Sequence, residues 1–364
     1  MNERKQGAGA TPRARDLGVK FDGEPGNYNA ITDVAGVEVG YATLIRGEGA
    51  LVRGHGPVRT GVTGILPRGR ANAPAPVFAA SFSLNGNGEL TGSHWIEESG
   101  ACEGPVTITN TNSCGLARDA TIRWLVERFD NGIDRWILPV AGETFDGELN
   151  DINGFHVTEA DVFQALDSAR GGALELGSVG GGTGMICYDF KGGSGSASRW
   201  VDIAGQRYCV GTFVQANFGR RQELTIRGIP VGRHIHGDEV RSDPGGSIIA
   251  VVATDAPLLP HQLKRLARRV SLGVARTGTV SHNGSGDLFL TFSTANAEML
   301  AKNAPRSEAV FLSNDRLNPL FTAVVESTEE AIIDSMVANE TMIGRDGLKV
   351  TALPHDRLMA LCRD

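Results

Sequence analysis

Apolar runs rich in β-branched and aromatic residues recur along the chain and indicate a set of buried strands. The predicted strands are residues 37–45, 77–84, 105–111, 135–144, 209–219, 247–254 and 287–294. Several of them lack the polar alternation of a half-exposed strand, so both of their faces are expected to be covered. The pattern therefore predicts sheets that lie inside the molecule.

Three segments repeat apolar residues at the spacing of a helix face, about 3.6 residues per turn. The predicted faces are Leu116, Ala120, Trp124 and Leu125, ahead of Asn131 and Gly132; Leu259, Leu263, Leu266 and Val270; and, within residues 319–339, Leu320, Val324, Ala331, Ile332 and Met336. This mixture of helices and strands predicts a layered α/β or α+β architecture. Because no internal repeat or Pro/Ser-rich linker divides the chain, residues 13–364 are expected to form a single domain after a loose amino-terminal arm, residues 1–12.

Glycine is abundant, with 48 residues, and is densest in residues 177–198. A phosphate-binding loop would be one interpretation, but the segment lacks both the Lys-Ser/Thr of a P-loop and G-x-G-x-x-G spacing. Clusters of Gly and Ser usually form turns. We therefore interpret residues 177–198 as a flexible loop around a short strand.

The charge balance and the cysteines narrow the classes of function. A formal net charge of -7 without clustered Lys and Arg argues against a nucleic-acid partner. No run of about 18 apolar residues occurs, so no membrane span is expected, and no apolar stretch follows the basic residues at the start, so no secretory signal is expected. The five cysteines are widely spaced and lack a C-x-x-C pair, which is typical of a reducing compartment. We expect a soluble, cytoplasmic protein.

One polar segment runs directly into an apolar strand, in the sequence SDPGGSIIAVVAT (residues 242–254). Ser247 follows Gly245 and Gly246 at this junction. A serine hydroxyl needs a base within about 2.6–3.2 Å to act as a nucleophile. If the Gly246–Ser247 bond were cut, the serine's own α-amine, with an ordinary pKa of about 7.7–8.0, could be that base. The glycines suit such a cut because they adopt backbone conformations that a side chain forbids.

Other chemistries have weaker support in the sequence. It contains neither a G-x-S-x-G motif nor H-E-x-x-H. His234 and His236 could point one way from a strand and share a metal with Asp238 or Glu239, but a full ligand set is missing, and an ordinary pair of strand-end histidines is the better interpretation. No metal or other cofactor is expected. For Ser247, a simple turn that enters a strand is the alternative.

Three further stretches place polar side chains at predicted strand ends. Ser285 and Asp287 lie two residues apart in SHNGSGD, so both can face one side of a strand and orient an amine. Asn217, in VQANFG, has an amide that can donate a hydrogen bond to an oxyanion. Glu143, in GETFDGELND, offers a carboxylate to a substrate ammonium. Each is an ordinary turn or loop residue when taken alone.

Ten stretches, taken together and in order, resemble one known family. They are RARDLG, NAITDVAGVEVG, TGVTGILPRG, NGNGELTG, NTNSCG, GETFDGELND, VQANFG, DPGGSIIAVVATDAPL, ARTGT and HNGSGD. They look like the self-processing L-aminopeptidase/D-esterase family, which includes the β-peptidyl aminopeptidases. The resemblance runs from about residue 13 to residue 360 and therefore covers nearly the whole chain.

The resemblance implies a fold and a maturation step. The fold is a four-layer αββα sandwich of the α+β class, with the N-terminal nucleophile type of hydrolase chemistry. The family is made as one chain that cuts itself before a serine, here between Gly246 and Ser247, which gives residues 1–246 and 247–364. The processed units are expected to assemble, commonly as a homotetramer.

The resemblance also implies roles for the residues named above. Ser247 is similar to the family's nucleophile, Ser285 and Asp287 to its supporting hydroxyl and acid, Asn217 to its oxyanion donor, and Glu143 to its anchor for the substrate amine. The implied reaction removes the amino-terminal residue from short peptides, amino-acid amides and esters, β-peptides among them, through an acyl-enzyme and without a cofactor.

Two departures from the family's pattern concern the substrate. Phe145, expected to contact substrate, stands where relatives carry tyrosine, and Asp287 is shorter than the glutamate of some β-peptide-cleaving members. The preference for α- or β-amino acids and for L or D residues therefore stays open. Two other functions also stay open: an acyltransferase of the related ornithine-acetyltransferase-like fold, whose nucleophile is usually threonine, and a non-catalytic small-molecule binder.

Overall fold

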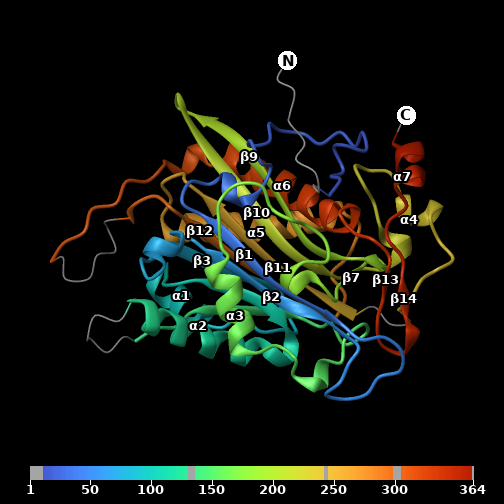
Figure 1. Cartoon of the computed structure of the whole chain (residues 1–364). Helices are drawn as coiled ribbons and strands as arrows, with labels where there is room; N and C mark the ends of the chain where they lie inside the picture. Colours follow the sequence, from blue (N-terminus) through green and yellow to red (C-terminus); the bar gives the residue numbers. More distant parts are fainter. Residues whose placement is uncertain (1–10, 130–135, 242–244, 298–304, 363–364) are drawn as a thin grey trace.

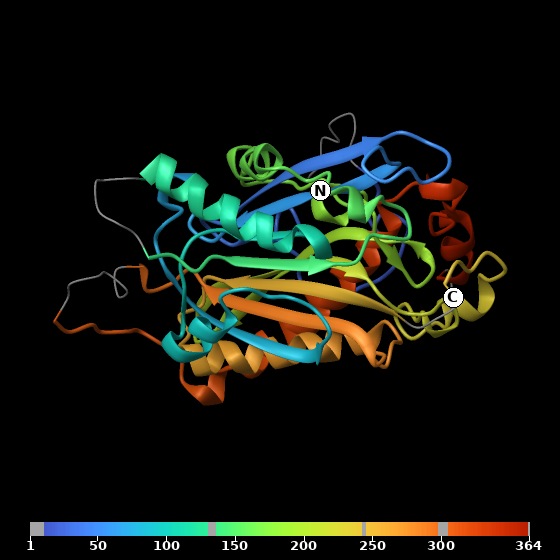
Figure 2. The ribbon, with the colours of Figure 1, turned by 90° about the horizontal axis from the view of Figure 1, so that it is seen from below.

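Two β-sheets lie face to face, and helices cover the outer face of each. The computed structural model describes residues 11–129, 136–241, 245–297 and 305–362. Figure 1 shows the whole chain, and Figure 2 shows α2 and α5 on opposite sides of the molecule with strands of both sheets between them. The layers run helix, sheet, sheet, helix, so the predicted αββα sandwich is confirmed.

The first sheet has four strands in the order β1 (Glu38–Arg46), β2 (Val58–Leu66), β5 (Val106–Asn110) and β6 (Val140–Thr144). β5 and β6 are parallel, and the other neighbours are antiparallel. The helices α2 (Cys114–Phe129) and α3 (Glu159–Asp167) pack on its outer face, where Trp124, Leu125 and Leu166 are buried. Because β5 and β6 are parallel, the carboxyl ends of both strands meet at one edge.

The second sheet has six strands in the order β4 (Ala101–Cys102), β3 (Val77–Gly86), β12 (Gly284–Ser293), β11 (Gly245–Thr254), β10 (Gln206–Asn217) and β9 (Gly193–Ile203). β11 and β12 are parallel, and the other neighbours are antiparallel. The helices α5 (Pro260–Arg276) and α6 (Asn318–Val337) cover its outer face. Between the sheets, buried apolar side chains such as Ile108, Phe213 and Val251 form the central core.

Smaller elements close the ends of the sandwich. They are the helices α1 (Ser93–Ser99), α4 (Val231–His234) and α7 (His355–Leu361), and two short hairpins, β7 (Ile186–Cys187) with β8 (Phe190–Lys191) and β13 (Met342–Ile343) with β14 (Lys349–Val350).

The predicted amphipathic helix at residues 319–339 is enclosed on nearly all sides, so that prediction is wrong about its polar face. The buried Glu330 of α6 accepts hydrogen bonds from Arg15 at 2.7 Å and from Arg199 at 2.6 Å, and Asp334 pairs with Arg13 at 2.6 Å. A carboxylate can be buried only when it is paired in this way. Although burial opposes the effect, the bonds and charges of the two arginines lower the pKa of Glu330.

The seven predicted strands are all present, but several boundaries differ. β11 begins at Gly245 and β12 at Gly284, so both start earlier than predicted, while β6 begins only at Val140. Residues 1–10 of the predicted arm, Arg135 and the Asn131–Gly132 helix end lie outside the described residues. In α2 the buried face is centred on Ala117, Thr121 and Trp124, and Leu116 is 40% exposed.

The interpretation of residues 177–198 as a flexible loop is wrong. These residues are mostly buried, and β9 begins among them at Gly193. The glycines permit close backbone approach: a side chain at Gly182 would meet the backbone of Ser194, and one at Gly195 would meet the backbone of Ala331. The glycine content therefore reflects tight packing rather than mobility. β2, which no prediction included, is likewise fully buried and rich in Gly and Thr.

Candidate active site

Ser247 is the third residue of β11, a central strand with partners on both sides. In the register of the sheet it lies opposite Asn217 of β10 and opposite Gly286 of β12. The residue is 6% exposed. Its hydroxyl donates a hydrogen bond of 2.7 Å to the carbonyl oxygen of Gly246, the residue that precedes it. The strand thus holds the hydroxyl against the peptide group that the sequence predicts to be cut.

The backbone at Gly246 requires glycine. Its φ is +142°, a value that residues with a side chain rarely adopt. A Cβ at this position would also lie against the carbonyl oxygen of Asn217 and within 2.7 Å of the Phe218 Cα. At Gly245, in contrast, a Cβ would meet nothing within 4 Å. The prediction that both glycines are needed for their conformation therefore holds for Gly246 alone.

Asn217 ends β10 and is completely buried. Its Oδ1 accepts hydrogen bonds from the Ile186 amide at 2.9 Å and from Nη2 of Arg241 at 2.8 Å. Its Nδ2 donates to the carbonyl oxygen of Phe145 at 2.8 Å. Two donors on one side of the amide and an acceptor on the other leave only one orientation that satisfies all three bonds.

Glu143 reaches the same place from the other sheet, near the end of β6, and is 3% exposed. Its Oε1 accepts a hydrogen bond of 3.0 Å from the Glu89 amide, and its Oε2 accepts one from the Thr111 hydroxyl. Burial raises the pKa of Glu143, while these two hydrogen bonds act in the opposite direction. A cation bound here would stabilise the ionised form of the Glu143 carboxylate, which burial disfavours.

A cavity of about 570 Å³ joins these groups. The residues from the sequence prediction that line it are Glu143, Phe145, Asn217, Gly246 and Ser247. Phe145 is 45% exposed, which places its ring at the solvent side of the cavity. The two sheets thus bring together residues that are as much as 104 positions apart in the chain. An open cavity containing a hydroxyl, an amide and a carboxylate is suited to binding and cleaving an amine-bearing acyl compound.

Ser285 and Asp287 lie beside this cavity but do not line it. The Ser285 hydroxyl donates to Oδ1 of Asp287 at 2.6 Å, so the predicted pair faces one side, as expected. Strand alternation turns both side chains toward the helix layer, because Leu288 and Leu290 point into the core between the sheets. Burial is the main cause that raises the pKa of Asp287, against hydrogen bonds from Ser285, Ser281 and Asn85.

Four residues that contribute to the site were not identified from the sequence. Thr111 and Glu89 bind the Glu143 carboxylate, while Arg241 binds Asn217 and is itself paired with Glu148 at 3.1 Å. Thr111 and Glu89 fall in the stretches NTNSCG and NGNGELTG, at the end of one predicted strand and a few residues beyond another, and this position was the available signal. The sequence around Arg241 and Glu148 contains no signal of a role in the site, because that role depends on contacts with residues distant in the chain.

The structure corrects the predicted location of His234 and His236. His234 is the last residue of the short helix α4 and His236 follows it, so neither lies at a strand end. Within the described part of the chain, no cluster of three or more His, Cys, Asp or Glu is arranged to hold a metal ion. In the same residues, no helix is both long enough and apolar enough to span a membrane.

Comparison with known proteins places the chain in a family. The sequence profile of peptidase family S58 matches residues 29–350. Two β-peptidyl aminopeptidases, from Sphingosinicella microcystinivorans and Sphingosinicella xenopeptidilytica, are 50% and 45% identical to this chain, over 97% of this chain and 92% of each relative.

Solved structures agree with the sequence relatives. The L-aminopeptidase D-Ala-esterase/amidase of Ochrobactrum anthropi, a prototype of the serine aminopeptidases and a variant of the Ntn hydrolase fold, superposes with a TM-score of 0.92 at 50% identity, covering 97% of this chain and 98% of that one. A Burkholderia sp. β-aminopeptidase gives 0.87 at 44% identity, with 97% and 98% covered. The chain therefore belongs to peptidase family S58 and is a serine aminopeptidase with the N-terminal nucleophile hydrolase fold.

Proposed function

We propose that the chain cuts itself between Gly246 and Ser247, and that the freed Ser247 is the nucleophile that removes the amino-terminal residue from short peptides. The observation that supports this most directly is the contact of the Ser247 hydroxyl with the Gly246 carbonyl, 2.7 Å between oxygens, at a glycine whose φ is +142°. A hydroxyl in this position needs only a small rotation to approach the carbonyl carbon.

Self-cleavage would proceed in two balanced steps. The Ser247 oxygen adds to the Gly246 carbonyl carbon and the C–N bond breaks, so the hydroxyl proton passes to the nitrogen and an ester replaces the amide. Water then hydrolyses the ester, which leaves a carboxylate on Gly246 and both a free hydroxyl and a free α-amine on Ser247. The products are residues 1–246 and 247–364, which stay together as one catalytic domain because β11 remains between β10 and β12.

In turnover, the new α-amine of Ser247 takes the proton of its own hydroxyl as the oxygen attacks the substrate carbonyl. Asn217 provides the oxyanion donor through the N–H of Nδ2 that the Phe145 carbonyl does not accept. One such donor is typically worth about 2.7–4 kcal/mol in the barrier. The leaving amine receives a proton from the Ser247 ammonium, and water then hydrolyses the acyl-enzyme.

Ser285 and Asp287 would act on the amine rather than on the hydroxyl. Ser247 lies opposite Gly286 in the parallel pair, so the backbone that carries its nitrogen lies about 4.8 Å across the ladder from the stretch of β12 with both residues. Once the bond to Gly246 is gone, this nitrogen can turn toward the Ser285 hydroxyl. The Ser285–Asp287 pair then supports the amine and helps to relay its proton.

Glu143 is proposed to anchor the amino group of the substrate, which makes the enzyme an aminopeptidase rather than an endopeptidase. Phe145 offers a ring and no hydroxyl at the cavity mouth. Since two relatives are named β-peptidyl aminopeptidases, we include amino-terminal β-amino acids among the substrates. We further propose a cytoplasmic homotetramer of processed units, in line with the family resemblance.

Processing gives the first test. The purified chain should run as two fragments on a denaturing gel, and the smaller fragment should begin Ser-Ile-Ile-Ala. Replacement of Ser247 with Ala should leave one intact chain and reduce p-nitroanilide hydrolysis to background, because the attacking oxygen is lost. A wild-type chain that stays whole yet hydrolyses anilides at full rate would refute the scheme. Comparison of α- and β-alanyl anilides then defines the acyl preference.

A further inference from the structure

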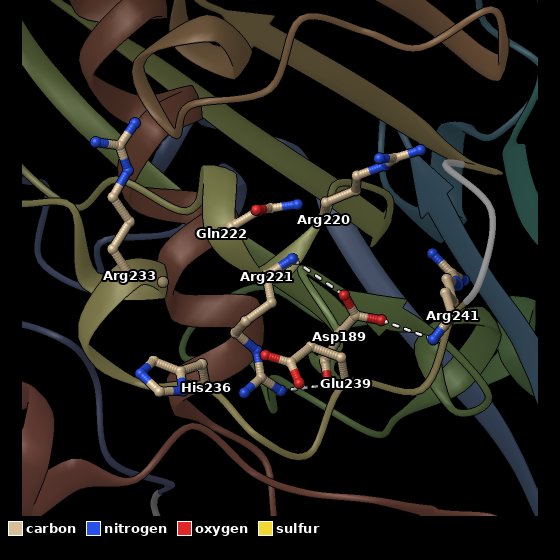
Figure 3. A pocket seen from close by; sticks show the side chains of 9 residues that line it. Asp189, Arg220, Arg221, Gln222, Arg233, His236, Glu239 and Arg241 are labelled. Carbon is tan, nitrogen blue, oxygen red and sulfur yellow. Dashed lines mark hydrogen bonds between the residues drawn. The ribbon is translucent and has the colours of Figure 1, made fainter.

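A second cavity, of about 590 Å³, lies next to the proposed active site. Four arginines and two carboxylates are among its lining residues, so its walls are cationic in a chain whose net charge is -7. Arg241 lines both this cavity and the cavity of Ser247. Figure 3 shows Arg220 and Arg241 on one side of Asp189 and Arg233 at the other end.

The arginines differ in how far their charge is already used. Arg221 is buried and pairs with Asp238, and its Nε donates to the Tyr188 carbonyl. Arg220 and Arg233 differ from Arg221, because no carboxylate or carbonyl of the described residues accepts a hydrogen bond from either of their guanidinium groups. Arg220 is also held in place through its backbone, since its amide donates to Glu223 at 3.1 Å.

Arg241 is partly engaged and partly free. Its Nε donates to Glu148, and Nη1 and Nη2 each donate one bond to Asn217, at 3.3 and 2.8 Å. A guanidinium has five N–H donors, so two are left. Asp189 fixes the backbone of this residue, since its Oδ1 accepts from the Arg241 amide at 3.0 Å (Figure 3). Glu148 neutralises part of the Arg241 charge. The positive charge next to Arg241 that has no carboxylate partner among the described residues is that of Arg220.

The charged groups around the nucleophile therefore occupy two cavities that share Arg241. Glu143 and Glu89 lie at one part of the Ser247 cavity, and Arg241 leads from the same cavity into the cationic one. Arg220 follows Asn217 by three residues, just beyond the end of β10. A dipeptide or tripeptide carries charges that complement the two cavities, with an ammonium at one end and, one or two residues beyond the scissile carbonyl, a carboxylate at the other, about 3.3–3.6 Å per residue.

We propose that this cationic cavity, through Arg220 and the free donors of Arg241, binds the terminal carboxylate of the leaving portion of the substrate. The enzyme then prefers very short peptides with a free carboxyl end over the corresponding amides. This inference rests on the proposed function, because it assigns the leaving-group side of the same reaction.

Matched substrates test the inference. The processed wild type is assayed with a dipeptide acid and with the same dipeptide as its carboxyl-terminal amide, using an amino-terminal residue that it accepts as an anilide. We expect a higher kcat/KM for the acid, and we expect Arg220→Gln to reduce the acid-to-amide ratio about five- to tenfold, since a half-exposed charged contact is worth less than a buried one. The loss should appear mainly in KM, because the contact is made in both ground and transition states.

The variants and controls separate this idea from its alternatives. Arg207→Gln makes the same change at the opposite end of β10, on an arginine paired with Glu24, and should leave the ratio unchanged. Arg220→Lys keeps the charge and should retain most of the ratio. Anilide hydrolysis, which involves no carboxylate, should be the same in every variant and shows that each is folded and processed.

Three results would overturn the carboxylate subsite while leaving the proposed function intact. The first is equal hydrolysis of acid and amide by the wild type, and the second is hydrolysis of the anilide with no hydrolysis of either dipeptide. The third is an Arg220→Gln variant whose acid-to-amide ratio matches that of the wild type. Failure of the proposed function looks different, since the wild type would then neither cut itself nor hydrolyse the anilide.

Discussion

At the scale of single residues, the hydrogen bonds that each side chain of the site already makes determine which bonds it can still make with a substrate. Asn217 has both sides of its amide bonded, so its orientation is set before any substrate arrives. Glu143 accepts one bond on each oxygen and is buried, so an ammonium is the group that its remaining lone pairs best receive. Such preorganisation spares the enzyme the cost of aligning these groups during the reaction.

Replacement of Glu143 with Gln tests the anchor at this scale. A hydrogen bond to a charged group contributes about 1.5–3 kcal/mol, so kcat/KM for amino-acid esters with a free amine should fall roughly 10- to 100-fold. The same esters with an acetylated amine should show little change. Glu89→Gln is the matched control, because it alters an exposed carboxylate of the same cavity and preserves the backbone amide that binds Glu143. Equal losses on free and blocked esters would contradict the role.

At the scale of elements, β11 positions the peptide bond that we propose to be cut. Its place between β10 and β12 fixes Ser247 on both sides, and the close approach of Asn217 and Phe218 leaves no room for a side chain at Gly246. A residue with a side chain would lose about 1–3 kcal/mol in such a backbone conformation, whereas glycine adopts a positive φ readily. We propose that the sheet in this way holds the Gly246–Ser247 peptide in a conformation that favours attack.

The two glycines of β11 provide a direct comparison. Gly246→Ala should slow self-cleavage by at least about tenfold, because φ of +142° and the close backbone of Asn217 and Phe218 exclude a Cβ. Gly245→Ala should be cut at nearly the wild-type rate, because a Cβ there meets nothing within 4 Å. A time course on denaturing gels, started from freshly synthesised chain, measures both. Similar rates for the two variants would show that the Gly246 conformation does not control processing.

At the scale of the whole molecule, burial of a carboxyl group makes the free energy of unfolding depend on pH. Asp146 follows β6 by two residues and is completely buried. Burial raises the pKa of Asp146 from 3.8 to about 7, and hydrogen bonds from Thr60, Asn150 and Asn110 only partly oppose this. The native state therefore keeps a proton that the unfolded chain loses between these values. As the pH rises through this window, the group lowers the free energy of unfolding.

This sign gives a prediction for stability. Between pH 5 and pH 8, the free energy of unfolding should fall less in the Asp146→Asn variant than in its parent. The difference should reach roughly 2–3 kcal/mol, because a shifted group contributes about 1.4 kcal/mol per pH unit. Urea unfolding in the uncut Ser247→Ala background measures the difference on one continuous chain. Asp119→Asn, at an exposed position, is the control and should follow the parent. Identical pH profiles for Asp146→Asn and its parent would contradict the assignment.

The sequence by itself determined seven of the strands, the helices α2, α5 and α6, and the candidate residues at strand ends, because apolar periodicity and turn chemistry are local properties. Ser247, Asn217, Glu143, Ser285 and Asp287 were all named from such positions, with the family resemblance supplying their roles. The boundaries of β11 and β12 were less accurate, since Gly and Ser carry no apolar signal and pair here only because a neighbouring strand is present.

Only the tertiary structure decided which of these residues meet. It brought Glu143 from the first sheet to Ser247 and Asn217 of the second, and it turned Ser285 and Asp287 to the opposite face. It also made the glycines of residues 177–198 part of the packed interior, and it placed Arg241 between two cavities. These outcomes depend on how two sheets and distant loops pack against each other, and no local pattern in a single chain encodes that contact.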